Sequence, residues 1–330
     1  MKAWLLDDFT GIDGLRLAEV AEPVLQAGDV LLELDYAGLN PADRYLAERQ
    51  YPAKPPLPHI LGRDGIGTVV RVGEGTTGIK PGDRRAILRG ETGVNRPGTF
   101  AERVAVRAEE LVEVPAEWSE REAAGATLVY LTAYQALTMW GDLPAEAVVL
   151  VTGASGGVGV AAVQLARAMG YTVVALSRDA EKAGRLRQMG AAFTFDPQDP
   201  LWRQAAKQAL GSRRVALAVD NIGGKLLPEV IDLLGDQGRA SLVGRLAGPV
   251  PNFNTATLFF RRIRLGGVAV GAYTNAESRA AWQAVCRLLR DTGSRPLVDS
   301  VFPFSRLGEA FNRLARGPMG KVLVQVKPPG

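Results

Sequence analysis

The sequence predicts an α/β protein, in which a doubly wound parallel sheet with helices on both faces is combined with a second, β-rich domain. Three observations predict this fold class. A short apolar run at 148–151 leads into a glycine-rich turn and then a helical pattern. From about residue 122 onward, strand and helix patterns alternate. Both ends of the chain show strand patterns instead.

The β-rich pattern begins with residues 30–36, where Val30, Leu32, Leu34 and Tyr36 share one face of a strand. Similar patterns recur along the first part of the chain and return at its end. We therefore expect a domain that is divided over 1–121 and 270–330, with 122–269 inserted between its parts. Its expected elements are strands at 30–36, 65–73 and 101–106, a helix at 307–315 and a strand at 321–326.

The inserted segment begins with a buried strand at 148–151 and a helix that ends on Gly170. Asp199 and Pro200 are typical of a helix start, as N-cap and first helical residue. The further expected elements are strands at 171–177, 193–195, 215–219, 239–243 and 265–270, with helices at 199–210 and 226–234. Strands and helices that alternate at this spacing predict a parallel sheet.

The turn after the first strand is a candidate phosphate site. Its residues Ser155, Gly156, Gly157 and Val158 lead into the helix, whose N-terminal amides favour a pyrophosphate. Ala154 replaces the first glycine of the usual G-x-G-x-x-G pattern, so the motif alone also fits an ordinary tight turn. The second strand that follows favours the dinucleotide interpretation.

The end of that second strand indicates which dinucleotide binds. NAD-selecting proteins place Asp or Glu there, whereas this chain has Ser177 and Arg178, with Lys182 four residues later. An arginine fork and a lysine would bind a 2′-phosphate, which a carboxylate would repel. The alternative is that both cations are solvated surface charges. We expect NADPH.

Composition excludes several classes of protein. The chain has 330 residues, 47% of them apolar, which suffices for two packed domains. No apolar run approaches the roughly 20 residues of a membrane span, and Asp7 and Asp8 interrupt any secretory signal. A net charge of +4 without basic–aromatic clusters argues against nucleic-acid binding. One cysteine suits a reducing compartment, so we expect a cytoplasmic protein.

Several collinear motifs together resemble those of the medium-chain dehydrogenase/reductase superfamily, specifically its zinc-free quinone oxidoreductase branch. The resemblance covers essentially the whole chain and implies a Rossmann domain with a GroES-like catalytic domain. The matching segments are 38–43 (Gly-Leu-Asn-Pro-Ala-Asp), 61–67 (Leu-Gly-Arg-Asp-Gly-Ile-Gly), 73–75 with 80–83, 131–134 (Leu-Thr-Ala-Tyr), 153–159 and 320–322 (Gly-Lys-Val).

The chain departs from the zinc-containing members of that superfamily at their metal positions. Gly38-Leu39-Asn40 stands where they carry a cysteine, and Gly62-Arg63-Asp64 where they carry Gly-His-Glu. Residues 89–99, which correspond to their cysteine-rich structural-zinc loop, contain no cysteine. With one cysteine and one histidine in the chain, a Cys/His zinc site is chemically unavailable, so we expect no metal.

The resemblance also implies site residues. It places Asn40 and Asp43 beside the nicotinamide and substrate, and Tyr51 on the substrate side, where Asn40 and Tyr51 could donate hydrogen bonds. The alternative for residues 40–43 is a turn held by its own side chains, and for Tyr51 an aromatic packed on prolines. His59 could act as an acid, although a structural role is the commoner one. The cofactor positions implied are Thr132, Asn221, Gly244, Arg245, Val268 and Ala269.

These observations predict an NADPH-dependent enzyme that transfers hydride to a quinone or an α,β-unsaturated carbonyl, because an acceptor without zinc must already be activated. Two alternatives stay open: an acryloyl-CoA-type enoyl thioester reductase, and a non-catalytic NADPH-binding protein. The resemblance implies a homodimer, which could pair along the expected strand at 265–270. The acceptor and the proton donor stay undetermined.

Overall fold

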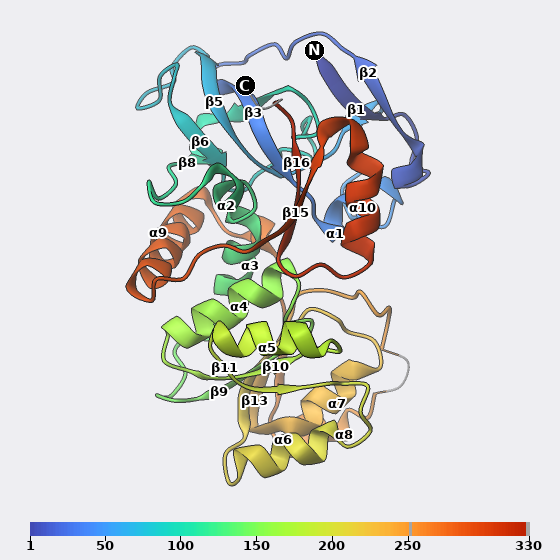
Figure 1. Cartoon of the computed structure of the whole chain (residues 1–330), viewed down its shortest axis with the longest axis vertical. Helices are drawn as coiled ribbons and strands as arrows, with labels where there is room; N and C mark the ends of the chain where they lie inside the picture. The colour runs from blue at the N-terminus through green and yellow to red at the C-terminus, as the bar shows by residue number, and fades with distance from the viewer. Residues whose placement is uncertain (251–252, 328–330) are drawn as a thin grey trace. The chain divides into compact units, whose positions relative to one another are not determined.

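The computed structural model describes residues 1–250 and 253–327, which form two compact units (Figure 1). Unit 1 comprises 1–128, 273–282 and 295–330, and unit 2 comprises 129–272 and 283–294. We expected boundaries at 121/122 and 269/270. The boundaries of the units instead fall within or next to two helices, α3 (Thr127–Thr138) and α9 (Asn275–Asp291). The roles expected for the two domains stay predictions.

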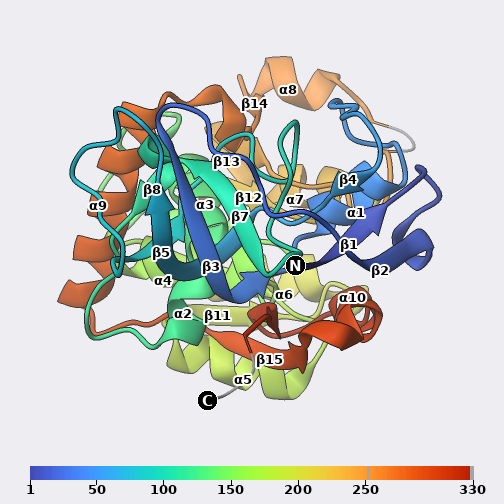
Figure 2. The ribbon, with the colours of Figure 1, turned by 90° about the horizontal axis from the view of Figure 1, so that it is seen from above.

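Unit 1 contains two sheets that are largely antiparallel. A three-stranded sheet has the order β2-β1-β4, and Figure 2 shows these strands together, apart from the larger sheet. The seven-stranded sheet has the order β15-β16-β3-β5-β6-β8, with β7 paired to β3. The strands are β1 (Lys2–Leu6), β2 (Leu15–Glu19), β3 (Asp29–Gly38), β4 (His59–Ile60), β5 (Asp64–Val72), β6 (Arg84–Ile87), β7 (Arg103–Arg107), β8 (Leu111–Val112), β15 (Val298–Pro303) and β16 (Lys321–Gln325).

The helices of unit 1 are short and lie next to strand ends. They are α1 (Pro41–Ala47), α2 (Glu120–Ala124) and α10 (Leu307–Ala315), and α10 packs beside β15 and β16 (Figure 1). The expected apolar stripe of α10 is confirmed, since Leu307, Ala310 and Phe311 are buried in the core of unit 1. That core also contains alternate residues of β3, including Val30 and Leu32.

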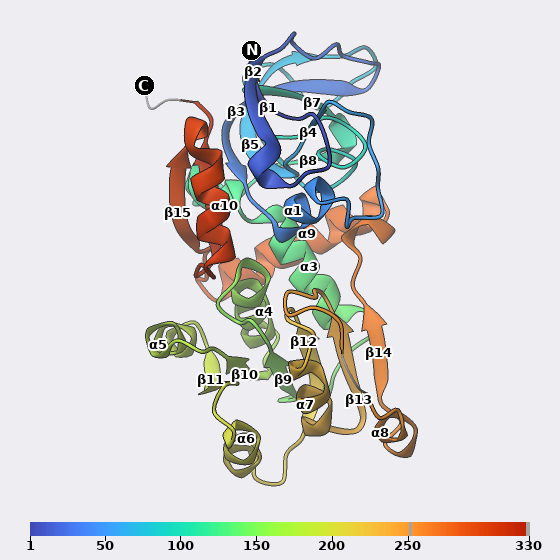
Figure 3. The same cartoon turned by 90° about the vertical axis from the view of Figure 1, so that its right-hand side faces the viewer.

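Unit 2 is a six-stranded parallel sheet with the order β11-β10-β9-β12-β13-β14, a sequence of strands that can be followed in Figure 3. The first strand lies in the middle and the strand order reverses there, so the expected doubly wound fold is confirmed. Its elements are β9 (Val148–Val151), α4 (Gly157–Ala168), β10 (Thr172–Leu176), α5 (Ala180–Gln188), β11 (Ala191–Phe195), α6 (Trp202–Leu210), β12 (Val215–Asp220), α7 (Leu226–Leu233), β13 (Leu234–Leu242), α8 (Ala256–Phe260) and β14 (Arg264–Gly267).

Several expected boundaries in unit 2 were wrong, among them the start of β13, which lies at Leu234 rather than at Arg239. Helix α6 begins at Trp202 rather than at Asp199, because the Asp199 carboxylate accepts the Leu201 N–H at 2.9 Å and forms a turn before the helix. The last strand, β14, ends at Gly267, so Val268 and Ala269 follow the strand instead of lying in it. The Val268 N–H still donates to Leu242 O at 2.9 Å, beside the end of β13.

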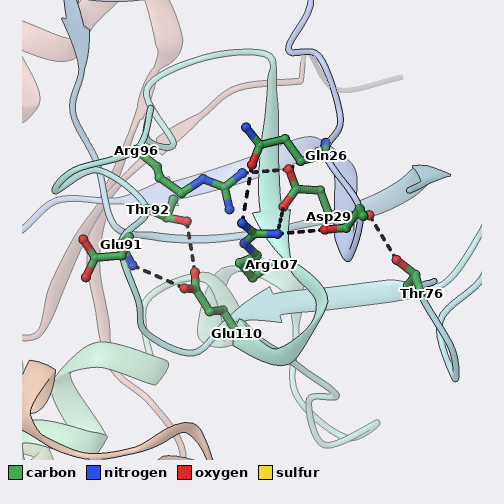
Figure 4. A network of polar contacts seen from close by, with 9 residues as sticks. Gln26, Asp29, Thr76, Glu91, Thr92, Arg96, Arg107 and Glu110 are labelled. Carbon is green, nitrogen blue, oxygen red and sulfur yellow. Dashed lines mark hydrogen bonds and ion pairs between the residues drawn. The ribbon is translucent and has the colours of Figure 1, made fainter. Parts of the chain in front are cut away.

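The loop at 89–99 is held by charged side chains (Figure 4). The Glu110 carboxylate accepts hydrogen bonds from the Glu91 N–H and the Thr92 hydroxyl, each at 3.4 Å. Arg96, on the same loop, donates to the fully buried carboxylate of Asp29 at 2.8 Å, at the start of β3. Ion pairing and hydrogen bonding to carboxylates therefore anchor this loop to the sheet of unit 1.

None of the helices in the described residues is both long and apolar enough to cross a membrane. Strand β14 lies at an edge of the parallel sheet. The chain therefore has the edge that the expected homodimer would use, and the homodimer itself stays a prediction.

Candidate functional site

The turn between β9 and α4 has the backbone of a phosphate site. Gly153 adopts φ +55°, and a Cβ on Gly159 would lie 2.2 Å from Gly153 O, so these two glycines let the turn close tightly onto the helix. The expected residues Ser155, Gly156, Gly157 and Val158 form the end of the turn and the first residues of α4, and all four are partly exposed. The N-terminal amides of this 12-residue helix are thus available to an anion.

Asn221 lies next to this turn, at the carboxyl end of β12. Its side-chain amide donates to Thr152 O at 2.8 Å, and its backbone N–H donates to Thr152 Oγ1 at 2.9 Å. These contacts fix the side chain, yet its Oδ1 is buried without a partner in the described part of the chain, in a residue that is 8% exposed. A buried oxygen of this kind costs free energy unless a ligand satisfies it.

Hydrogen bonds to a buried carboxylate likewise hold the loop after β12 in place. Asp220 is completely buried and accepts hydrogen bonds from the Thr152 hydroxyl at 2.6 Å and from the N–H groups of Ile222 and Gly223. Burial raises the pKa of Asp220 against the opposing effect of these hydrogen bonds. Thr152, Asp220 and Asn221 thus lock the carboxyl ends of β9 and β12 together at the point where the strand order reverses.

The expected 2′-phosphate residues follow β10, the neighbouring strand on the other side of β9. Ser177 is 8% exposed at its end, Arg178 is exposed, and Lys182 lies in the first turn of α5. Asp179, which was not among the expected residues, places a carboxylate beside Arg178. This carboxylate caps α5 by accepting the Lys182 N–H at 3.0 Å, so one of its oxygens is used within the helix start.

The remaining expected cofactor residues are spread over unit 2. Gly244 and the exposed Arg245 follow β13, and a Cβ on Gly244 would lie 2.6 Å from Asn221 O, which brings this turn close to Asn221. Val268 and Ala269 follow β14, and Thr132 is 9% exposed on α3. Most of the expected cofactor-binding residues thus lie at the carboxyl ends of the parallel strands.

A dinucleotide fits the residues at this sheet edge. The unpartnered Oδ1 of Asn221 is a ready acceptor for a ligand hydroxyl or amide, and the glycines let the turn close tightly before the N-terminus of α4. Residues 155–158 would hold the pyrophosphate, whereas Ser177, Arg178 and Lys182 would face the ribose end.

In unit 1, the expected catalytic residues Asn40 and Asp43 lie at the start of α1 and are buried. Asp43 is 0% exposed, and its Oδ2 accepts the backbone N–H of Asn40 at 2.9 Å. Complete burial raises the pKa of Asp43, opposed chiefly by the charge of Arg63. The interpretation of 40–43 as a turn held by its own side chains therefore describes Asp43 well.

Lys321, the first residue of β16, bridges Asn40 and Asp64. Its ammonium donates to Asn40 Oδ1 at 2.6 Å and to Asp64 Oδ2, while the Asn40 amide donates to Asp64 Oδ2 at 3.0 Å. Lys321 is 4% exposed and Asp64 is 0% exposed. Cβ atoms on Gly38 and Gly125 would lie 2.9 and 2.6 Å from the Lys321 side chain, so two glycines make the channel that its methylene groups occupy.

These contacts show that the residues at the zinc position of the superfamily do not fit a metal. Asn40 stands where those members carry a cysteine and Arg63 where they carry a histidine, and the neighbouring Asp64 is already paired with the Lys321 ammonium. Among the described residues, no group of three or more His, Cys, Asp or Glu side chains could hold a metal ion. A dication would here meet one buried cation and the guanidinium of Arg63.

Arg63, which the sequence marks only as a departure from the superfamily's histidine, is also a site residue. Its Nε donates to Asp43 Oδ1 at 3.1 Å and its Nη2 to Ala42 O at 3.3 Å, which fastens the guanidinium to α1. Its Cζ lies 4.5 Å from the centre of the Tyr51 ring, a cation–π contact. Burial opposes the charged form, but Asp43 and Tyr51 raise the pKa of Arg63 overall. Arg63 therefore connects Asp43 with Tyr51, which is partly exposed.

His59 is structural at neutral pH. It lies in β4, is 3% exposed, and its Nε2 is buried without a partner in the described residues. Burial, together with the charge of Arg63, lowers its pKa to about 4, although a contact with the Gly93 backbone raises it. A neutral imidazole of this pKa has no proton to give near pH 7, so His59 does not serve as an acid there.

We expect Lys321→Met to lower the free energy of unfolding by about 3–5 kcal/mol, because it leaves the buried Asp64 carboxylate unpaired. Urea unfolding followed by circular dichroism measures the loss. Lys327→Met is the matched control: Lys327 pairs with Glu33 at the surface with 54% of its side chain exposed, so it should cost less than about 1 kcal/mol. Equal losses in the two variants would contradict the assignment.

We expect protonation of His59 to destabilise the protein between about pH 6.5 and 4. The unfolded chain binds this proton at a higher pH than the folded chain, in which His59 has a pKa of about 4. The free energy of unfolding therefore decreases as the pH is lowered through this window. Between pH 7.5 and 5 the wild type should lose about 2 kcal/mol more than His59→Gln. The chain has one histidine, so NMR of its ring reports the pKa directly, and a value near 6.5 would refute the prediction.

Comparisons with known proteins extend over nearly the whole chain. Residues 26–116 match the family described as alcohol dehydrogenase GroES-like domain, and residues 157–290 match that described as zinc-binding dehydrogenase. A quinone oxidoreductase of Lama guanicoe is 29% identical, with 99% of this chain and 98% of the relative covered. The human synaptic vesicle membrane protein VAT-1 homolog is 30% identical over 98% of this chain and 86% of its own.

Solved structures agree with these sequence matches. An NAD-dependent alcohol dehydrogenase has a TM-score of 0.90 and 28% identity, with 99% of this chain and 100% of that chain covered. A mycobacterial protein complexed with NADPH has a TM-score of 0.89 and 26% identity, with 98% and 99% covered. On this evidence the chain is an oxidoreductase that belongs to the medium-chain dehydrogenase/reductase superfamily, in its quinone oxidoreductase branch.

Proposed function

We propose that this protein reduces quinones or α,β-unsaturated carbonyl compounds with NADPH, without a metal. The observation that carries the proposal is the Lys321–Asp64 pair with Asn40, which takes up the position of the superfamily's zinc ligands with protein charges. Zinc activates poor hydride acceptors by polarising their carbonyl group. A protein whose residues at these positions repel zinc cannot polarise a carbonyl group in this way. Its hydride acceptor must therefore already be electrophilic.

Within this proposal, each group of residues has a separate task. Bound NADPH supplies the hydride. Residues 155–158 bind the pyrophosphate, Asn221 Oδ1 accepts a hydrogen bond from the nucleotide, and Arg178 with Lys182 binds the 2′-phosphate. In unit 1, Tyr51 is the partly exposed residue among the three proposed as catalytic, since Asn40 and Asp43 are buried, and its hydroxyl would be the donor to the substrate.

The alternatives differ from the proposal in measurable ways. An enoyl thioester reductase would prefer acryloyl-CoA over the free carbonyl compounds, and a non-catalytic protein would bind NADPH without turnover. The family includes proteins named alcohol dehydrogenase. Quinone or enone reduction is favoured over alcohol oxidation because Asn40 and Arg63 are not zinc ligands.

We expect NADPH to be consumed with benzoquinone or cyclohexenone and not with a simple ketone such as cyclohexanone. Absorbance at the reduced nicotinamide band measures turnover, with acryloyl-CoA and an aliphatic enal in the same panel. The saturated ketone is the matched control for the activated double bond. Faster turnover of acryloyl-CoA would replace the proposed acceptor, and tight NADPH binding without any turnover would support the non-catalytic alternative.

We expect Arg178→Ala to raise KM for NADPH about ten- to a hundredfold while leaving KM for NADH nearly unchanged, because only NADPH carries the 2′-phosphate. Initial rates with both cofactors measure the difference. Arg185→Ala serves as the control. Arg185 is also exposed, but it lies in the last turn of α5, whereas Arg178 precedes the first turn. Equal effects of Arg178→Ala on both cofactors would contradict the 2′-phosphate assignment.

A further inference from the structure

The guanidinium of Arg63 is fastened by one of its edges. Nε donates to Asp43 Oδ1 and Nη2 donates to Ala42 O, and these two nitrogens form one edge of the planar group. Asp43 in turn is fixed by the Asn40 N–H at the start of α1. The orientation of Arg63 is therefore set by a buried carboxylate and a backbone carbonyl, without any ligand.

One face of the guanidinium is covered by Tyr51. Its Cζ lies 4.5 Å from the ring centre, and the contact with Tyr51 adds to the stability of the charged form of Arg63. The side chain of Arg63 is 10% exposed, whereas that of Asp43 is 0% exposed. The carboxylate is thus closed off from solvent, while part of its cationic partner remains accessible beside a half-buried tyrosine.

The edge formed by Nη1 and the second hydrogen of Nη2 is not used by the anchoring contacts. Arg63 also makes a side-chain hydrogen bond with Tyr51, so Tyr51 is both its stacking partner and its polar neighbour outside α1. An arginine held in this way is a preorganised donor, because the rotamer entropy of its long side chain is already lost before a ligand arrives.

We propose that Arg63, together with the Tyr51 hydroxyl, binds the oxygen atom of the acceptor that becomes negatively charged when hydride is added. This inference rests on the proposed function and specifies its substrate side. Two neighbouring donors, one of them cationic, recognise a phenolate or enolate oxygen better than a neutral carbonyl oxygen. The preference therefore increases as the reaction proceeds, which is the condition for catalysis by differential binding.

For a quinone, the electron count is simple. NADPH, which is oxidised to NADP⁺, would supply a hydride, that is, two electrons and one hydrogen nucleus. When the hydride reaches one quinone oxygen, both C=O π bonds become C–O single bonds as the ring becomes aromatic, and the second oxygen carries the negative charge of the hydroquinone monoanion. The negative charge lies on this oxygen until a proton from solvent gives the hydroquinone. Arg63 stays protonated throughout, since Asp43 keeps its pKa raised.

The test uses 4-nitrophenol, whose anion resembles the hydroquinone monoanion and absorbs differently from the neutral phenol. Titration of the full-length protein, with and without NADP⁺, near the pKa of the free probe gives the affinity for each form. We expect wild-type protein to bind the phenolate in preference and to lower the apparent pKa of the bound probe. 4-Nitroanisole, which cannot ionise, controls for apolar contacts.

We expect Arg63→Met to weaken binding of 4-nitrophenolate about ten- to a hundredfold and to leave binding of 4-nitroanisole nearly unchanged. Arg63→Lys keeps a cation beside Asp43 but lacks the fork, so it should retain the fold and lose most of the preference for the anion. Arg44→Gln is the control on α1, because Arg44 pairs with Glu48 at the surface. Circular dichroism checks that each variant is folded.

The outcomes separate this inference from the proposed function. Unchanged 4-nitrophenolate binding in folded Arg63→Lys protein would overturn the inference, even if quinones are reduced. Loss of anion binding in both Arg63 variants, with Arg44→Gln like wild type, would support it. If wild type shows this Arg63-dependent binding but reduces no acceptor, then the proposed function fails while the anion site stands.

Discussion

The structure of unit 1 depends on the buried ion pair between Lys321 and Asp64. The two residues are 257 positions apart in sequence, and their contact joins the first residue of β16 to the first residue of β5. Asn40, which follows the end of β3, completes the group by accepting from Lys321 and donating to Asp64. Three chain segments that could separate independently are thereby held by one set of charges.

The Lys321–Asp64 pair also explains the residue types at three nearby positions, Gly38, Gly125 and Thr127, none of which has a chemical role of its own. Gly38 and Gly125 leave the space in which the lysine side chain lies, and the Thr127 hydroxyl lies between Ile87 O at 2.6 Å and Asp64 Oδ1 at 3.3 Å. A buried pair of charges is tolerated only when its remaining hydrogen-bonding capacity is met. Asn40 and Thr127 help to meet that condition here, and the two glycines provide the space.

Much of the fold could be predicted from local sequence patterns. Buried strands such as 148–151 and the apolar stripe of α10 are set by periodicity, and Gly170 ends α4 with φ +80°. Boundaries failed where a side chain competed for backbone groups, as at Asp199, or where nothing local marks the end, as at Gly267. The boundaries between the two units lie inside or next to helices, where the amino-acid composition gives no sign of them.

The site was less predictable, because its decisive contacts join distant residues. The motif around Lys321 was recognised, and Arg63 was noticed as a departure from a histidine, yet neither pattern says that the two cations belong to one region of unit 1. Pairing each with its carboxylate required the fold: Lys321 with Asp64, and Arg63 with Asp43. The sequence signal for these pairs is an acidic residue in each of two glycine-containing motifs, Asp43 in 38–43 and Asp64 in 61–67.

These two pairs leave the region electrically balanced but rich in oriented donors. Each buried carboxylate cancels the charge of one cation, which limits the cost of desolvation. Asp64 and Asn40 take up the Lys321 ammonium inside the unit, whereas Arg63 spends only one edge on Asp43 and Ala42. One cation thus stabilises the scaffold of unit 1, and the other remains partly accessible, as the proposed binding of a negatively charged substrate oxygen requires.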